Sequence, residues 1–101
     1  MINLDNQFTN IIDKYKKIEI SLNNIEATNT EDLIKLNREY ADLKPIVDKI
    51  EEYKKEQKEI LNLNDLVKDN DQELKKMAEI ELNDLNLQHE IDEKKLKLFL
   101  L

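Results

Sequence analysis

Apolar residues in the first part of the chain recur every seven positions, with gaps that alternate between four and three. This spacing is typical of one face of a helix that packs in a coiled coil or a bundle. The stripe consists of Leu4, Phe8, Ile11, Tyr15, Ile18, Leu22 and Ile25. We predict a helix over about 3–27 with Asn3 as its N-cap, followed by a turn at 28–30. Thr28 and Glu31 have the spacing of a capping box for the next helix.

A second stripe predicts a longer helix over about 30–69. Its members are Leu33, Leu36, Tyr40, Leu43, Val47, Ile50, Tyr53, Gln57, Ile60, Asn64 and Val67. Pro45 interrupts this pattern, and a proline inside a helix cannot donate a backbone hydrogen bond, here to the carbonyl of Ala41, at a cost of roughly 3 kcal/mol. We therefore expect the helix to kink at Pro45, or to restart with Pro45 in its first turn.

A third helix is predicted over about 71–100, after a turn at 69–71. Asn70 and Glu73 have capping-box spacing at its start. One stripe holds Leu74, Ala78, Leu82, Leu85, His89, Leu96 and Phe99. A second stripe holds Met77, Ile80, Leu87, Ile91 and Leu98. Together they predict a wide apolar face that contacts two neighbouring helices.

The helix lengths and connections predict one elongated domain over 1–101. Both connections are short, which favours antiparallel packing of consecutive helices. The first helix is much shorter than the second and can cover only part of it. We therefore predict an all-α, antiparallel three-helix coiled-coil bundle. The second and third helices should project as a hairpin with its tip near 69–71.

Composition excludes several kinds of chemistry. The 101 residues include no Gly, no Cys and a single His. Glycine-dependent phosphate loops, disulfides, thiolate metal sites and cysteine catalysis are therefore excluded. The net charge of −7 argues against independent nucleic-acid binding. The longest apolar run has four residues, Leu98 to Leu101, so we expect no membrane segment and a cytoplasmic location.

Four groups of residues could carry chemistry. His89 and Asp92, at helical spacing, could form a base and its orienting carboxylate, but we interpret them as a polar layer that fixes helix register. The carboxylates Glu51, Glu52, Glu56 and Glu59, and the acidic turn at 69–73, lack the ligand pattern of known metal sites. We interpret Tyr15, Tyr40 and Tyr53 as residues at the rim of the core. The lysines are interleaved with Glu and predict a solvated face: Lys54, Lys55, Lys58, Lys94, Lys95 and Lys97. We predict no catalytic, cofactor or metal site.

Several segments resemble one family in order and spacing. Residues 37–43 read NREYADL, residues 45–47 read PIV, residues 77–82 read MAEIEL and residues 98–101 read LFLL. This pattern over 36–101 resembles the N-terminal helical domain of bacterial class I peptide chain release factors, of the release factor one type that reads UAA and UAG. The resemblance also implies that the apolar end at 96–101 leads into a further domain, so that the chain is a fragment of a longer protein.

The resemblance implies an accessory role in translation termination. In this family a Gly-Gly-Gln tripeptide triggers peptidyl-tRNA hydrolysis and a Pro-x-Thr tripeptide reads the stop codon. Both lie beyond Leu101 in the family, and neither occurs in this chain. The implied partners are the stalk base of the large ribosomal subunit and the class II release factor GTPase. We expect no enzymatic activity and no cofactor.

Two alternatives stay open. One is a stand-alone coiled-coil scaffold or chaperone-like module that binds a partner helix. The other is the sister release factor that reads UGA, against which the REYA sequence at 38–41 argues. The apolar C-terminal residues also predict that the isolated chain can form a homodimer at high concentration.

Overall fold

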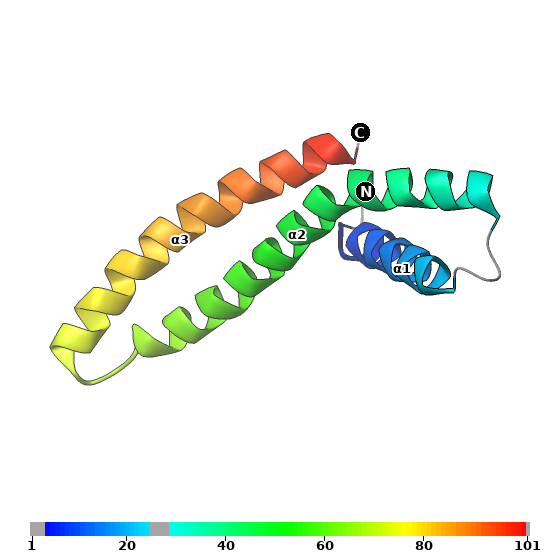
Figure 1. Cartoon of the computed structure of the whole chain (residues 1–101). Helices are drawn as coiled ribbons and strands as arrows, with labels where there is room; N and C mark the ends of the chain where they lie inside the picture. The colour runs from blue at the N-terminus through cyan, green and yellow to red at the C-terminus, as the bar shows by residue number, and fades with distance from the viewer. Residues whose placement is uncertain (1–3, 25–28, 101) are drawn as a thin grey trace. The chain divides into compact units, whose positions relative to one another are not determined.

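The computed structural model describes residues 4–24 and 29–100, which form three α-helices and no strand within these ranges. α1 spans Leu4–Asn23, α2 spans Thr30–Leu66 and α3 spans Gln72–Phe99 (Figure 1). The predicted all-α class with three helices is confirmed. The chain divides into two compact units, Met1–Asp48 and Lys49–Leu101, and α2 belongs to both. The single elongated domain with a projecting hairpin stays a prediction.

The first unit joins α1 to the first part of α2. Phe8, Tyr15 and Ile18 are buried, and the other described members of the α1 stripe are half-buried. Ile25 lies outside the described residues. The rings of Tyr15 and Tyr40 stack with their centroids 4.5 Å apart and an interplanar angle of 13°. The heptad spacing therefore identifies the packed face of α1.

A side chain caps the start of α2. The Asn29 side-chain oxygen accepts a hydrogen bond from the backbone N–H of Asp32 at 2.8 Å. The backbone carbonyl of Asn29 accepts from the N–H of Leu33 at 2.9 Å. Asn29 is thus the N-cap, a position where asparagine is among the favoured residues. The predicted cap residues Asn3 and Thr28 lie outside the described residues.

α2 continues through Pro45 without a break. The alternative in which the helix restarts at this residue is therefore wrong. The missing N–H removes one backbone hydrogen bond, but the surrounding turns of a 37-residue helix keep theirs. Pro45 is exposed, so the unpaired carbonyl one turn earlier can be hydrated. The kink at Pro45 stays a prediction.

The second unit pairs the rest of α2 with α3, which runs back along it in the opposite direction (Figure 1). Its most buried apolar residues are Ile50, Tyr53 and Leu63 on α2 and Ala78 and Leu96 on α3. This antiparallel pairing is the one that the short connection predicts.

The buried stripe of α2 differs from the prediction after Tyr53. Gln57 and Asn64 are exposed, and Glu56 and Leu63 are buried in their place. Both choices keep a spacing of three or four residues, since a helix of 3.6 residues per turn accommodates either. Burying Leu63 gains roughly 2 kcal/mol of hydrophobic transfer energy. The packing against α3 therefore selects this face.

The turn between α2 and α3 also departs from the prediction. α2 ends at Leu66 rather than near residue 69, and two backbone hydrogen bonds close the turn, from Lys68 to Asp65 and from Asp69 to Leu66. The N-cap of α3 is Asp71, not Asn70. The Asp71 carboxylate accepts from the N–H groups of Glu73 at 3.0 Å and Leu74 at 3.3 Å. An aspartate here also carries a negative charge that suits a helix N-terminus.

The second apolar stripe of α3 lies on a different side of the helix from the residues buried against α2. Its five residues are all exposed: Met77, Ile80, Leu87, Ile91 and Leu98. α2 packs on the side of α3 that carries Ala78 and Leu96, so this stripe takes no part in the core of the second unit, and its contact with a second neighbour stays a prediction. Among the described residues, no helix combines the length and the apolar character that crossing a membrane requires.

Candidate functional site: a polar layer in the α2–α3 hairpin

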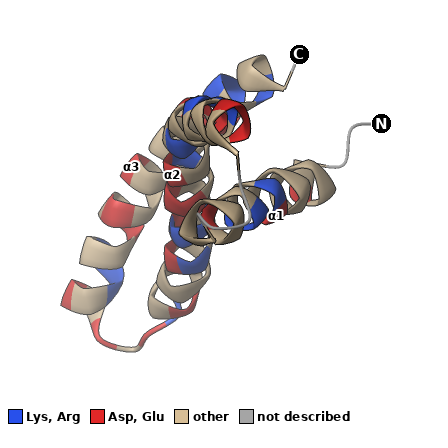
Figure 2. Ribbon diagram, turned by 45° about the vertical axis from the view of Figure 1, so that its right-hand side comes forward, with Lys and Arg blue, Asp and Glu red and all other residues tan. Residues whose placement is uncertain are grey.

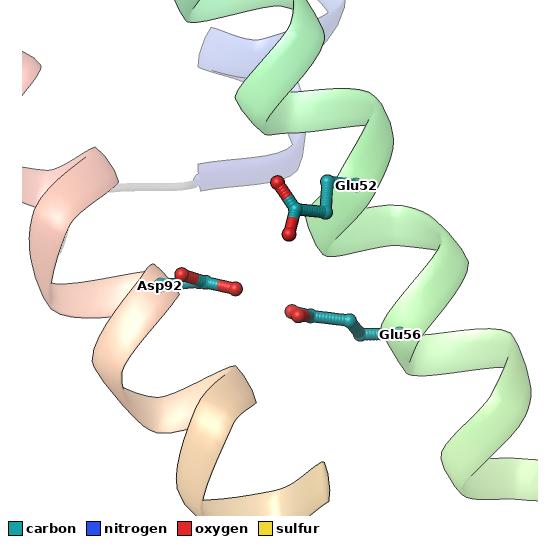
Figure 3. A group of neighbouring side chains, drawn as sticks. All are labelled: Glu52, Glu56 and Asp92. Carbon is teal, nitrogen blue, oxygen red and sulfur yellow. The ribbon is translucent and has the colours of Figure 1, made fainter.

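Charged residues of α2 and α3 meet inside the second unit. On α2, Lys49, Glu52 and Glu56 are three or four residues apart and so lie on one face of the helix. On α3, His89 and Asp92 share the face that packs against α2. We call these five residues the polar layer. Figure 3 shows that Glu52 and Glu56 project from α2 toward Asp92 on α3.

Two α2 side chains hold His89 in place. Its Nδ1 atom lies 3.1 Å from Oε1 of Glu56. Its ring stacks on Tyr53 with the centroids 4.1 Å apart and an interplanar angle of 15°. The hydrogen-bond partner of His89 is therefore Glu56, whereas the sequence spacing suggested Asp92. Both contacts cross between the helices, which supports the interpretation of His89 as a residue that fixes register.

Asp92 forms the buried end of the layer, with a side chain that has no exposed surface. Its Oδ1 atom accepts from Lys49 Nζ at 2.9 Å and from Gln88 Nε2 at 3.1 Å. Burial alone would raise the pKa of Asp92. Hydrogen bonds with Glu56, Lys49 and Gln88 outweigh burial and hold this pKa below its ordinary value.

Glu56 shows the opposite shift. Burial, together with a hydrogen bond to Asp92, raises the pKa of Glu56 above its ordinary value, and the contact with His89 only partly opposes this. A hydrogen bond between two carboxyl groups needs a proton on one of them, and the opposite directions of the two pKa shifts place it on Glu56. The two carboxyl groups therefore favour a state in which Glu56 is neutral and Asp92 is charged.

The layer brings together three carboxylates that could hold a metal ion. Glu52, Glu56 and Asp92 each offer an oxygen, and these oxygens lie within 4.8 Å of one another (Figure 3). However, Lys49 Nζ lies 2.9 Å from Asp92 and 3.5 Å from Glu52. Its ammonium already supplies a positive charge there, so an ion would have to displace it. The residues present fit a lysine-centred ion pair better than a metal centre.

The layer combines acid, base and ion-pairing groups with few candidate nucleophiles. Residues 49–101 contain no Ser, Thr or Cys, so the layer has no hydroxyl or thiol nucleophile beside His89 except the phenol of Tyr53. Every polar contact in it joins α2 to α3 or orients a residue that does. Such a layer fixes the register of two helices.

Several other candidate residues lie outside the polar layer. Glu51 and Glu59 are exposed and take no part in it. Asp69 Oδ1 accepts from the backbone N–H of Asp71 at 2.8 Å, so the acidic turn uses its carboxylates on the backbone. In the first unit, the hydroxyl of Tyr40 donates to Glu19 Oε1 at 3.0 Å. Hydrogen bonding with Tyr15, with burial and Glu19 adding to it, raises the pKa of Tyr40.

Most of the lysines singled out in the sequence lie at the surface. Lys54 is half-buried, and Lys55 and Lys58 are exposed. Lys94 and Lys97 form ion pairs with Glu90 at 3.6 Å and Glu93 at 3.3 Å. Figure 2 shows acidic and basic residues interspersed along the helices, as expected of a solvated surface.

Sequence reasoning missed Lys49 and Gln88. Gln88 is four residues before Asp92 on α3, and Lys49 lies next to the buried Ile50 on α2. The pair of Lys49 and Asp92 could have been predicted from one pattern: a lysine next to a core position on one helix, and a buried aspartate opposite it on the other.

Comparisons with known proteins identify relatives of the chain. The family model for the PCRF domain matches residues 11–101. Peptide chain release factor 1 of Caldicellulosiruptor saccharolyticus is 37% identical over 93 residues, which cover 90% of this chain and 26% of that protein. The same factor of Pelagibacter ubique is 45% identical over 67 residues, covering 64% of this chain and 19% of that protein.

A third relative extends over nearly the whole sequence. Peptide chain release factor 1 of Ehrlichia ruminantium, strain Gardel, is 31% identical over 102 residues, covering 99% of this chain and 28% of that protein. The chain thus spans about a fifth to just over a quarter of the relatives described. No solved structure is significantly similar to it.

Proposed function

The chain belongs to the PCRF domain family and is of the peptide chain release factor 1 type, and from this premise we propose that it is the accessory helical domain of a factor that terminates translation at UAA and UAG. The single observation that carries the proposal is the match of the family model to residues 11–101. The REYA and PIV segments on α2 add to it.

The domain acts by binding, not by catalysis. The chain contains no Gly and therefore no Gly-Gly-Gln. Its polar layer is occupied with joining α2 to α3 and offers no nucleophile to a substrate. In the intact factor we propose that it works in the cytoplasm, contacting the stalk base of the large ribosomal subunit and the class II release factor GTPase. Its net charge of −7 favours a basic protein surface over direct contact with RNA.

The first experiment separates binding from catalysis. Purified 1–101 is added to ribosomes that carry labelled peptidyl-tRNA and a stop codon. We expect no release of peptide, whereas release by this chain alone would overturn the accessory role. The full gene product is then tested at UAA, UAG and UGA. Release at UAA and UAG supports the proposal, and release at UGA without UAG assigns the chain to the sister factor.

A chimera tests the domain itself. The segment of the Caldicellulosiruptor factor that matches this chain is replaced by residues 1–101, and the parent factor and a parent without the segment serve as controls. We expect the chimera to release peptide more like the parent than like the deleted form.

The alternative function is a stand-alone coiled-coil scaffold, which the exposed apolar stripe of α3 favours. A folded chimera that behaves like the deleted parent would support this alternative.

A further inference from the structure

The outer face of α3 carries a complete heptad pattern that packs against nothing in the second unit. Four apolar members are Ile80, Leu87, Ile91 and Leu98, and their side chains are 59%, 62%, 48% and 69% exposed. Consecutive members of the stripe, including Asp84 and Lys94, are spaced 4-3-4-3-4 from Ile80 to Leu98. We call these six residues the outer stripe.

The outer stripe is distinct from the face that packs on α2. Leu87 and the buried Leu96 are nine residues apart and, at 100° per residue, point about 180° away from each other. A seam of exposed apolar residues at heptad spacing is the pattern by which one helix pairs with another. This argument uses α3 alone and does not depend on the proposed function.

The two charged members of the stripe determine what fits against it. Asp84 lies toward the N-terminal end of the stripe and Lys94 toward its C-terminal end. We propose that the occupant is a second copy of this chain, with its α3 antiparallel to the first. In this register Ile80 lies opposite the partner copy's Leu98, Leu87 opposite Ile91, and Asp84 opposite Lys94. Two-fold symmetry forms each of these pairs twice.

The same charges exclude the other simple arrangement. In a parallel, in-register pair, Asp84 would face a second Asp84 and Lys94 a second Lys94. Like charges at seam positions oppose association, and opposite charges there select one orientation. Lys94 is free to exchange partners, because its ion pair with Glu90 is a long one at 3.6 Å between two mostly exposed side chains.

The contact is short, so the dimer is weak. From Ile80 to Leu98 the helix rises about 27 Å, which is less than the seam of most stable coiled-coil dimers. We expect the 101-residue chain to be a monomer at low micromolar concentration and a dimer toward millimolar concentration. Sedimentation equilibrium over this range measures it, and a chain that stays monomeric throughout would overturn the proposal.

A matched pair of substitutions locates the surface. Leu87→Asp should shift the chain toward the monomer, whereas Ile34→Asp, at a residue of α2 that is 60% exposed, should leave the equilibrium unchanged. Circular dichroism checks that both variants keep their helices. Dimerisation that survives Leu87→Asp, or that Ile34→Asp abolishes, would contradict the assignment to α3.

Charge exchange tests the register. Asp84→Lys and Lys94→Asp should each be monomeric alone, since each places like charges opposite one another twice. An equal mixture of the two should form a heterodimer, and the double variant should form a homodimer. These four outcomes follow only from pairing residue 84 with residue 94. Failure of the mixture to associate would overturn the antiparallel register.

Introduced thiols give an independent readout, because the chain has no cysteine of its own. Under oxidising conditions a mixture of Ile80→Cys and Leu98→Cys should form a mixed disulfide faster than either variant cross-links with itself. Faster self-cross-linking of each variant would indicate a parallel pair and refute the proposal.

Discussion

The ammonium of Lys49 lies 2.9 Å from Oδ1 of Asp92, a carboxylate with no exposed surface. This ion pair crosses from α2 to α3. It lies at one side of the polar layer, and the pair of Glu56 and His89 lies at the other. The two pairs together explain why a hairpin with so few large apolar residues in its core has a defined register.

Removing only one member of this pair should destabilise the hairpin. Asp92→Ala leaves Lys49 and the Gln88 amide without their acceptor, and we expect a loss of roughly 2 kcal/mol in the free energy of unfolding. Replacing both partners, as Asp92→Leu with Lys49→Met, should recover most of this loss, because apolar residues of similar size often replace a buried ion pair without cost. Urea denaturation followed by circular dichroism measures both. Equal losses in the single and double variants would show that the pair does not act as a unit.

Glu56→Gln should stabilise the protein at neutral pH and not at acidic pH. The folded state raises the pKa of Glu56 above its ordinary value of 4.5, so the folded state holds a proton that the unfolded chain releases first. The stabilising effect of that proton is complete below 4.5 and declines as pH rises toward the folded-state pKa. A glutamine keeps an N–H donor toward Asp92 at every pH. We expect a gain of about 1 kcal/mol at neutral pH, measured by denaturation across pH.

Two features make the test of Glu56 specific. Glu59→Gln, at an exposed position one turn along α2, serves as the control and should change nothing beyond the small effect of a surface charge. The lowered pKa of Asp92 acts in the other direction, because its contribution is present above its ordinary value of 3.8 and is lost on acidification. A Glu56→Gln variant that is destabilised at neutral pH would mean that the ionised carboxylate is the form the fold requires.

The register of α2 can be tested by paired truncations. Leu63→Ala should cost roughly 2–4 kcal/mol, because its side chain is buried against α3 and its removal leaves a cavity. Leu61→Ala removes the same atoms from a side chain that is 66% exposed and should change stability by less than about 0.5 kcal/mol. Thermal unfolding of the two variants gives the comparison. Similar losses in both would contradict the buried face assigned to α2.

The start of α3 can be tested in the same way. Asp71→Ala removes the acceptor for two backbone N–H groups and should cost about 1 kcal/mol. Asn70→Ala, at the neighbouring exposed residue, should cost clearly less. Hydrogen exchange at Glu73 and Leu74 provides a local readout, since loss of the cap should speed exchange there. A larger effect of Asn70→Ala would restore the cap that the capping-box spacing predicted.

The sequence was sufficient to predict the packed face of a helix where the apolar repeat was strict. The stripe from Leu4 to Leu22 and that from Leu33 to Ile50 correctly identified packed faces. Beyond Tyr53, two adjacent residues at each turn of α2 could face α3 with helical spacing. Periodicity alone therefore cannot decide whether Gln57 or Glu56 is the buried residue. That choice depends on His89, which lies 33 residues away. The hydrogen-bond partner of His89 could not be predicted from the sequence for the same reason, because local spacing points to Asp92.

The acidic turn presented a similar ambiguity. Asn70 and Asp71 are both good cap residues, and only the Asp69 carboxylate, which binds the backbone of Asp71, distinguishes them. For the second apolar stripe of α3, the pattern shows that a face is hydrophobic without showing what covers it.

The boundary between the two units falls inside α2, after Asp48, and not in a loop. Backbone hydrogen bonds that span four residues therefore cross the boundary. When one unit unfolds, the part of α2 that belongs to the other unit loses some of these bonds and frays. Helix-to-coil change on one side is thereby transmitted to the other through the peptide backbone itself. Cooperativity of this kind requires no interface between the units, and it makes the turns of α2 around Asp48 the segment through which their unfolding is coupled.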